Sequence, residues 1–162
     1  MTRAGCIDRD KLKFRLGRAA DVEPLLKLFA KDFFEETGFA EFAIFDLQRA
    51  IVGMTRQVRM GETPFIVAEV DGEPVGFAGY HLSHIFTVAP IAYLWVIYVS
   101  PRFRRGPIGR MLLWLLFDLA RGDGATAFFA TVPITAPSAR GLCNLLQRVG
   151  CTPMRGAFLR RL

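Results

Sequence analysis

A short basic loop between two apolar stretches is the segment of this sequence best suited to bind a charged ligand. It carries four arginines and two glycines, namely Arg102, Arg104, Arg105, Gly106, Gly109 and Arg110. If a helix begins here, its first turn presents unpaired backbone N–H groups and a partial positive charge. Glycines allow close backbone approach, and arginines add charge-assisted hydrogen bonds. The spacing therefore predicts an anion site, although a basic helix start with incidental arginines fits it as well.

The charge of the chain is concentrated in its second half. Residues 1–89 carry 11 Lys and Arg against 13 Asp and Glu, a balance of −2. Residues 90–162 carry 10 Arg against two acidic residues, a balance of +8. This asymmetry favours a polyanionic partner, which could be a nucleic acid, a phosphorylated cofactor or an acidic membrane. A solvated basic surface without a partner is the alternative.

Apolar periodicity and turn residues predict the elements that would position this loop. Strands are expected over Phe14–Leu16, Pro64–Val70, Val75–Ser83, Ile91–Val99, Thr126–Val132 and, as a terminal pair, Thr152–Arg160. Helices are expected over Val22–Phe34, Asp46–Val58, Gly109–Ala120 and Ser138–Val149, with caps at Asp21, Gly122 and Gly150. Asp71-Gly72 predicts a hairpin turn. This order predicts an α/β fold, with a mixed sheet flanked by helices.

Two of these elements are almost entirely apolar. The strand at Ile91–Val99 is expected to be central and covered on both faces. The helix at Gly109–Ala120 is expected to be buried against the sheet. The chain has 162 residues, 52% of them hydrophobic, which suits a single domain over 1–162.

The segment from Val99 to Leu113 resembles the acyl-CoA signature of the GNAT N-acetyltransferases, V-x-P-x-[YF]-[RQ]-x-x-G-x-[GA]-x-x-L-[LIM]. The matching positions are Val99, Pro101, Phe103, Arg104, Gly109, Leu112 and Leu113. The similarity continues at Arg18–Asp21, Phe65–Phe77, Gly122–Ala125 and Leu145–Gly150. The resemblance implies a mixed, mostly antiparallel sheet of six to seven strands with helices on both faces, in the order β-α-α-β-β-β-α-β-α-β-β. It also implies an N-acyltransferase that moves an acetyl or short acyl group from acyl-CoA to a primary amine.

The resemblance further implies where acetyl-CoA would bind. The loop would hold the pyrophosphate through Arg104, Arg105, Gly106, Ile108, Gly109 and Arg110. The backbone of Ile97, Tyr98 and Val99 would pair with the pantetheine arm, and the helix beginning near Ser138 would flank it. No metal is expected.

One loop position departs from the signature. Pro107 replaces the first glycine of R-x-x-G-x-G, so one potential N–H donor is lost. Proline nevertheless suits the first position of a helix. Gly106 is expected to supply the close backbone approach, and binding weaker than is usual in the family is expected.

The usual catalytic groups of the family are absent from their usual positions. Many members have a glutamate base where this chain has Tyr93, and a tyrosine acid where it has Leu146. The replacement candidates are Tyr93 itself, Tyr98, His81 and His84. Three of them also have a structural interpretation, in the core for Tyr98 and at the surface or in a hydrogen bond for the two histidines. A catalytically silent protein that binds acyl-CoA and acts as a sensor or interaction module is therefore the second hypothesis.

The acceptor is indicated only by charge. Five acidic residues gather around the connection of the first two helices, at Asp32, Glu35, Glu36, Glu41 and Asp46. In the GNAT family this region walls the acceptor site, so an acidic wall favours a cationic amine, either a small molecule or a lysine side chain. A solvated acidic helix end fits the pattern equally well.

Other classes are disfavoured by composition. The cysteines Cys6, Cys143 and Cys151 lack C-x-x-C spacing, which speaks against a disulfide framework or a zinc site. The apolar runs are too short to span a bilayer. The arginines gather at one loop and the C-terminus rather than along a helix face, so no nucleic-acid partner is expected. We expect a cytoplasmic protein without a membrane partner. The resemblance further implies that the protein forms a homodimer.

Overall fold

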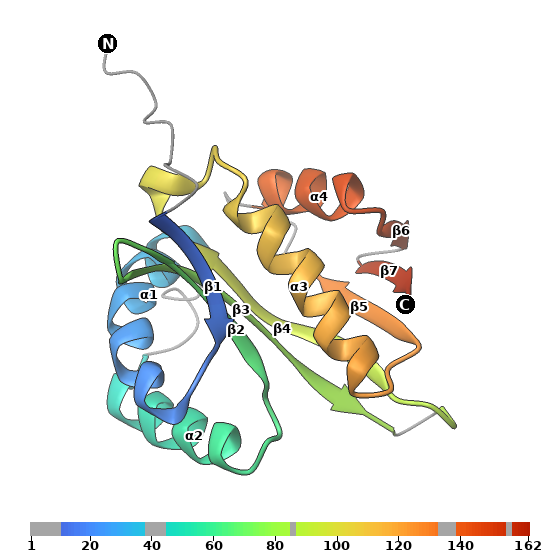
Figure 1. Ribbon diagram of the computed structural model, residues 1–162, viewed down its shortest axis with the longest axis horizontal. Helices are drawn as coiled ribbons and strands as arrows, with labels where there is room; N and C mark the ends of the chain where they lie inside the picture. Colours follow the sequence, from blue (N-terminus) through green and yellow to red (C-terminus); the bar gives the residue numbers. More distant parts are fainter. Residues whose placement is uncertain (1–10, 38–44, 85–86, 133–138, 155–156) are drawn as a thin grey trace.

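The computed structural model describes residues 11–37, 45–84, 87–132, 139–154 and 157–162. Its strands form a seven-stranded sheet in the order β1-β2-β3-β4-β5-β7-β6 (Figure 1). The strands are β1 (Leu12–Leu16), β2 (Phe65–Val70), β3 (Glu73–Ser83), β4 (Ile91–Val99), β5 (Ala127–Thr131), β6 (Thr152–Met154) and β7 (Ala157–Arg161). The helices are α1 (Val22–Thr37), α2 (Leu47–Arg59), α3 (Ile108–Gly122) and α4 (Ala139–Arg148). The pair β4–β5 is parallel, and the other paired strands are antiparallel. The predicted fold and the order of its elements are confirmed.

The sheet separates two apolar cores (Figure 1). On one face, α3 and α4 bury Leu112, Phe117 and Leu146 against the sheet. On the other face, α1 and α2 cover the β1–β4 half, where Phe77 and Tyr98 are buried. Burying a side chain of this size stabilises the fold by roughly 1.5–3 kcal/mol. The helices therefore fix the sheet from both sides, but α1 and α2 cover only part of their face.

Several turns follow the sequence, and one does not. Asp71 and Gly72 have φ values of 54° and 84°, which the predicted hairpin turn requires. Gly150 has φ 85° two residues after the end of α4, as a helix-ending glycine does. The predicted cap at Gly122 is wrong, because α3 continues through this residue and Gly124, with φ 84°, takes the left-handed conformation.

The helix α3 also differs from its prediction. Six of its side chains are buried against the sheet and α4, as its apolar pattern suggests. However, Met111, Trp114 and Leu115 are 38%, 42% and 37% exposed. An apolar pattern all round the helix therefore does not mean that every face is covered. None of the helices in the described ranges combines the length and apolar character that a bilayer-spanning segment needs.

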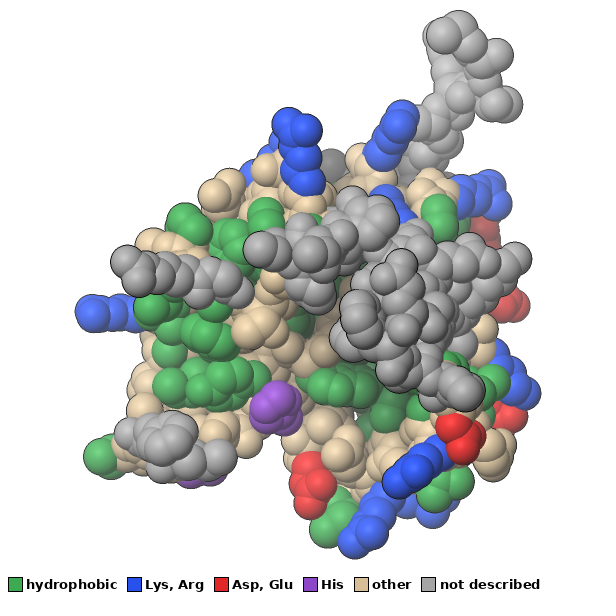
Figure 2. Space-filling model, turned by 180° about the vertical axis from the view of Figure 1, so that it is seen from behind, with side chains coloured by type: hydrophobic (Ala, Val, Ile, Leu, Met, Phe, Trp, Pro, Cys, Tyr) green, Lys and Arg blue, Asp and Glu red, His purple; other side chains and the backbone are tan. Residues whose placement is uncertain are grey.

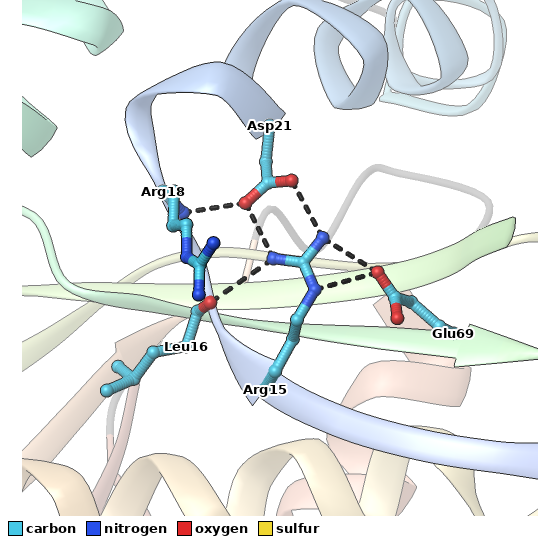
Figure 3. Close-up of polar contacts among 5 residues, drawn as sticks. All are labelled: Arg15, Leu16, Arg18, Asp21 and Glu69. Carbon is cyan, nitrogen blue, oxygen red and sulfur yellow. Dashed lines mark hydrogen bonds and ion pairs between the residues drawn. The ribbon is translucent and has the colours of Figure 1, made fainter. Parts of the chain in front are cut away.

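A charged cluster connects β1 to the start of α1 (Figure 3). The Arg15 guanidinium donates to both carboxylate oxygens of Asp21 at 2.7 Å, and its Nε donates to Glu69 on β2 at 2.8 Å. The predicted helix cap Asp21 accepts the backbone N–H of Arg18 at 2.7 Å and so shapes the short turn before α1. The hydrogen bond from Arg15 lowers the pKa of the Asp21 carboxyl group, and that of Arg15 is raised in turn. This cluster fixes the direction in which α1 leaves the sheet.

The strands β4 and β5 separate soon after they begin. Their pairing covers only Ile91–Tyr93 of β4 and Ala127–Phe129 of β5. The rest of β4, through Val99, pairs with β3 on its other side. Beyond Tyr93, the edge of β4 that faces β5 is therefore not part of a strand ladder with β5.

A bulge lies at the same place on β4. Gly79 of β3 pairs with Val96 and Tyr80 pairs with Leu94, so Trp95 is the extra residue. Glycine at position 79 relieves a close contact with β2, because a Cβ there would lie 3.0 Å from Cβ of Phe65, whereas the Trp95 ring would be at an ordinary contact distance of 3.6 Å. Trp95 was expected to pack in the core, but it is 41% exposed.

Candidate functional site

The predicted anion loop connects the end of β4 directly to α3. A short turn at Pro101–Phe103 follows β4, and Pro107 precedes the first residue of α3. The first helical hydrogen bond runs from the Met111 N–H to the Pro107 carbonyl at 3.0 Å. The amides of Ile108, Gly109 and Arg110 come before it and have no carbonyl four residues back within the helix. The helix therefore begins with three backbone donors and a partial positive charge at its end.

Gly106 uses its own backbone N–H within the loop. Its N–H donates to the Phe103 carbonyl at 3.1 Å and so closes the turn. The Arg104 N–H makes a longer bond of 3.4 Å to Pro101. The donors that remain for an anion at this end of α3 are thus the first helical amides rather than that of Gly106.

Gly109 lies where three elements meet. A Cβ at this position would be 3.1 Å from Cδ2 of Leu145 on α4 and 3.8 Å from Cγ2 of Val99. The glycine therefore allows the first turn of α3 to pack closely on both α4 and the end of β4. The Ile108 side chain is fully buried in the same core and anchors the turn.

The four loop arginines differ in their surroundings. The side chains of Arg102, Arg105 and Arg110 are exposed at the start of α3. The Arg104 guanidinium instead turns back onto the protein, where its Nε donates to the Val99 carbonyl at 2.7 Å. This bond connects the loop to the last residue of β4.

A second contact connects Arg104 to α1. Its guanidinium lies 3.9 Å from the Asp32 carboxylate and 5.7 Å from the centre of the Tyr98 ring. The Tyr98 hydroxyl donates to the same carboxylate. Burial, and then this hydrogen bond, raise the pKa of Tyr98 to about 12. At neutral pH, Tyr98 is therefore a protonated donor, with its ring packed against Phe29 of α1.

On the other face of β4, Ile97 and Val99 pack against the core beneath α3. Together with Tyr98 they form the part of the strand that has left β5. This edge ends at the loop, where the Arg104 bond holds its last carbonyl. The edge of β4 that has left β5 thus leads directly to the first turn of α3, and the two form one continuous path.

A row of side chains crosses the sheet where β4 and β5 separate. His81 on β3 pairs with Tyr93 on β4, which pairs with Phe129 on β5, which pairs with Leu159 on β7. The His81 and Tyr93 rings stack at 5.4 Å with an angle of 9° between their planes, and the Phe129 ring lies 5.3 Å from Tyr93. We call these four side chains the cross-strand row. They lie on the sheet face away from α3, where hydrophobic side chains reach the surface (Figure 2).

The structure separates the other candidates. His84 is exposed and lies beyond the end of β3, outside the cross-strand row. Leu146, which stands at the usual position of a tyrosine acid, is a fully buried residue of α4. Ser138 and Glu41 lie outside the described residues. Of the acidic cluster, Asp32 contacts Tyr98 and Arg104, and Asp46 caps α2 by accepting the Arg49 N–H at 2.9 Å.

Sequence reasoning missed two features of this site. The bulge at Trp95 leaves a trace only in Gly79, a glycine within an apolar strand. The contact of Asp32 with Tyr98 joins residues 66 positions apart, and no local pattern indicates it.

Comparisons with known proteins agree on one family. The sequence model of the acetyltransferase (GNAT) family matches residues 22–150. No curated protein matches the sequence at a significant level. Matches among solved structures are numerous, and three of them illustrate the range.

A putative acetyltransferase of Salmonella typhimurium, yncA, solved with acetyl-CoA, has a TM-score of 0.77 at 17% identity over 94% of each chain. A ribosomal-protein-alanine N-acetyltransferase of Brucella melitensis has a TM-score of 0.72 at 22% identity, over 93% of this chain and 99% of that one. An aminoglycoside acetyltransferase from an uncultured soil sample, solved with sisomicin, has a TM-score of 0.69 at 16% identity, over 90% and 91%. At these identities the likeness shows a shared fold.

Proposed function

Because the chain belongs to the acetyltransferase (GNAT) family, we propose that it transfers an acetyl group from acetyl-CoA to the nitrogen of a primary amine. The observation that carries the proposal is the continuous path from the edge of β4 to the start of α3. Such a path suits a ligand with an extended amide-containing arm and a diphosphate. Acetyl-CoA, the co-substrate of this family, has both.

The described residues fit this co-substrate. The amides of Ile108, Gly109 and Arg110 would hold the diphosphate, with the exposed guanidinium groups of Arg105 and Arg110 beside it. The backbone of 97–99, whose last carbonyl is already held by Arg104, would lie along the amide-containing arm, because a strand edge that has left its neighbour presents donors and acceptors to a ligand. The excess of arginine in the second half of the chain then has a polyanionic partner.

The reaction requires the amine to lose one proton and the thiolate to gain one. The amine nitrogen bonds to the thioester carbon, the carbon–sulfur bond breaks, and the released thiolate is protonated. A lysine-like amine with a pKa near 10.4 is mostly protonated at neutral pH, so a base or a water relay is needed. Tyr93 and His81 are the polar ring groups beside the opening between β4 and β5, and we assign the proton transfer to them.

The second candidate is a protein that binds acetyl-CoA without transferring the acetyl group. The full burial of Leu146 favours it, because no acid can be supplied from that position. This loss has a modest effect if the leaving thiol has a pKa near 8.5, since such a thiolate leaves without a dedicated acid. Acetyl transfer therefore remains our first choice.

Two measurements test the proposal. Acetyl-CoA should raise the melting temperature, because a ligand that binds only the folded state stabilises it. Free thiol should then be released from acetyl-CoA when a panel of primary amines is added, and mass spectrometry should find the acetylated amine. A melting shift without thiol release would favour the silent protein. The absence of any shift would contradict both candidates.

A further inference from the structure

We infer that the cross-strand row is the floor of an acceptor site for a primary amine that carries an aromatic ring, such as an arylalkylamine. This inference rests on the proposed function, because it names the substrate class of the same site. It starts from the position of the row. Tyr93 is the last residue of β4 that pairs with β5, so the row ends where the open edge of β4 begins.

The row is not used by either core of the protein. His81, Tyr93, Phe129 and Leu159 belong to neither apolar core that the described residues form. Yet their side chains are continuous, because each pairs with the next across four neighbouring strands. Their rings also contact one another and form a surface of aromatic groups. A surface of this kind suits a flat apolar ligand, since aromatic groups bind well by stacking or by edge contacts.

Neighbouring features enlarge this surface without adding negative charge. The Trp95 ring lies on the same sheet face, over Gly79, and is 41% exposed. Asp32 on α1 is hydrogen-bonded to Tyr98. Within the described residues, the row therefore offers rings rather than carboxylates to an amine.

Binding can be tested separately from turnover. The chain has two tryptophans, so Trp114→Phe leaves Trp95 as the only fluorescent indole. Phenethylamine should change Trp95 fluorescence at a concentration about three to ten times lower than 2-cyclohexylethylamine, which has a similar size but no aromatic ring. This factor is the size of one aromatic contact. Equal binding of the two amines, or no change with either, would overturn the inference.

The same preference should appear in kcat/KM and should depend on Phe129. Phe129→Leu should lower kcat/KM for phenethylamine about three- to tenfold and leave the value for 2-cyclohexylethylamine nearly unchanged, with KM for acetyl-CoA unaffected. Leu115→Ala is the matched control, because Leu115 is an exposed apolar side chain on α3, on the opposite face. Its kcat/KM should equal that of the wild type.

The outcomes distinguish the proposed function from the inferred class of acceptor. Thiol release with aliphatic amines or polyamines, without any aromatic preference, would refute the inference and leave the proposed function standing. Ring-dependent binding without thiol release from any amine would refute the proposed function and leave the aromatic site standing.

Discussion

Replacing Arg104 by alanine should weaken acetyl-CoA binding about tenfold. The substitution removes the 2.7 Å bond from Nε to the Val99 carbonyl and the contact with Asp32 at 3.9 Å. A hydrogen bond from a charged group contributes about 1.5–3 kcal/mol. The Arg104 side chain is 35% exposed, so solvent screening reduces the expected loss to about 1–2 kcal/mol.

Part of this energy would be lost from ligand binding, because the bond holds the end of β4 and the loop in the arrangement that a ligand would use. Loss of the whole 1–2 kcal/mol from binding would raise Kd roughly 5- to 30-fold, so loss of part of it gives the expected rise of about tenfold. Isothermal titration with acetyl-CoA would measure it. Arg104→Lys is the informative comparison, because lysine keeps the charge but has no Nε donor at the same place.

The two variants separate position from charge. If Arg104 acts by holding the Val99 carbonyl, Lys should be almost as weak as Ala. If it acts only as a positive charge near the diphosphate, Lys should bind like the wild type and should show a similar salt dependence. An unchanged Kd in Arg104→Ala would refute the reasoning for both roles.

Three further predictions concern single positions. Gly109→Ala should bind acetyl-CoA nearly as well as the wild type, because the added Cβ meets the end of the flexible Leu145 side chain at 3.1 Å and Val99 only at an ordinary contact distance of 3.8 Å. Gly109→Glu should bind at least tenfold more weakly in the same titration, because it places a negative charge at the helix start. Gly76→Ala should lower the melting temperature, with a loss of about 1–3 kcal/mol, because its Cβ would lie 2.8 Å from the Tyr98 carbonyl oxygen; an unchanged melting curve would contradict this close approach. Asp21→Asn should destabilise the protein at pH 7 by about 1–2 kcal/mol, the size of a partly exposed charge-assisted bond to Arg15. Because the folded-state pKa of Asp21 is below its ordinary 3.8, the carboxylate stabilises the fold above about pH 4 and loses this effect as the pH falls through the folded value. Thermal unfolding of both proteins at pH 7 and pH 3 should therefore give a smaller difference at pH 3.

The order of strands and helices could be predicted because local pattern controls it. The apolar run of β4 gave its bounds correctly, and the Asp71-Gly72 turn fixed the register of the hairpin between β2 and β3. The sequence did not show whether Gly122 or Gly124 ends α3. The two glycines lie within three residues of each other, and the local sequence does not distinguish them.

The exposure of apolar groups was harder to predict than their location. A strand that is apolar on both faces was expected to be covered on both, yet Trp95 and the row around Tyr93 reach the surface. Composition alone cannot tell a face that is covered by a helix from one that is available to a ligand. The same limit explains the exposed side chains of α3. The Asp32 contact could not be foreseen either, because it depends on how α1 lies across the sheet.

The parting of β4 and β5 has a consequence for the mechanics of the molecule. The three C-terminal strands are joined to the other four through a seam of three residue pairs, supplemented by the packing of α3. A molecule of acetyl-CoA bound along the edge of β4 would occupy the place of a neighbouring strand and would connect the two groups of strands. The hydrogen-exchange protection of β5 and β7 measures how firmly the two groups of strands are held together. This protection should then increase with the concentration of acetyl-CoA.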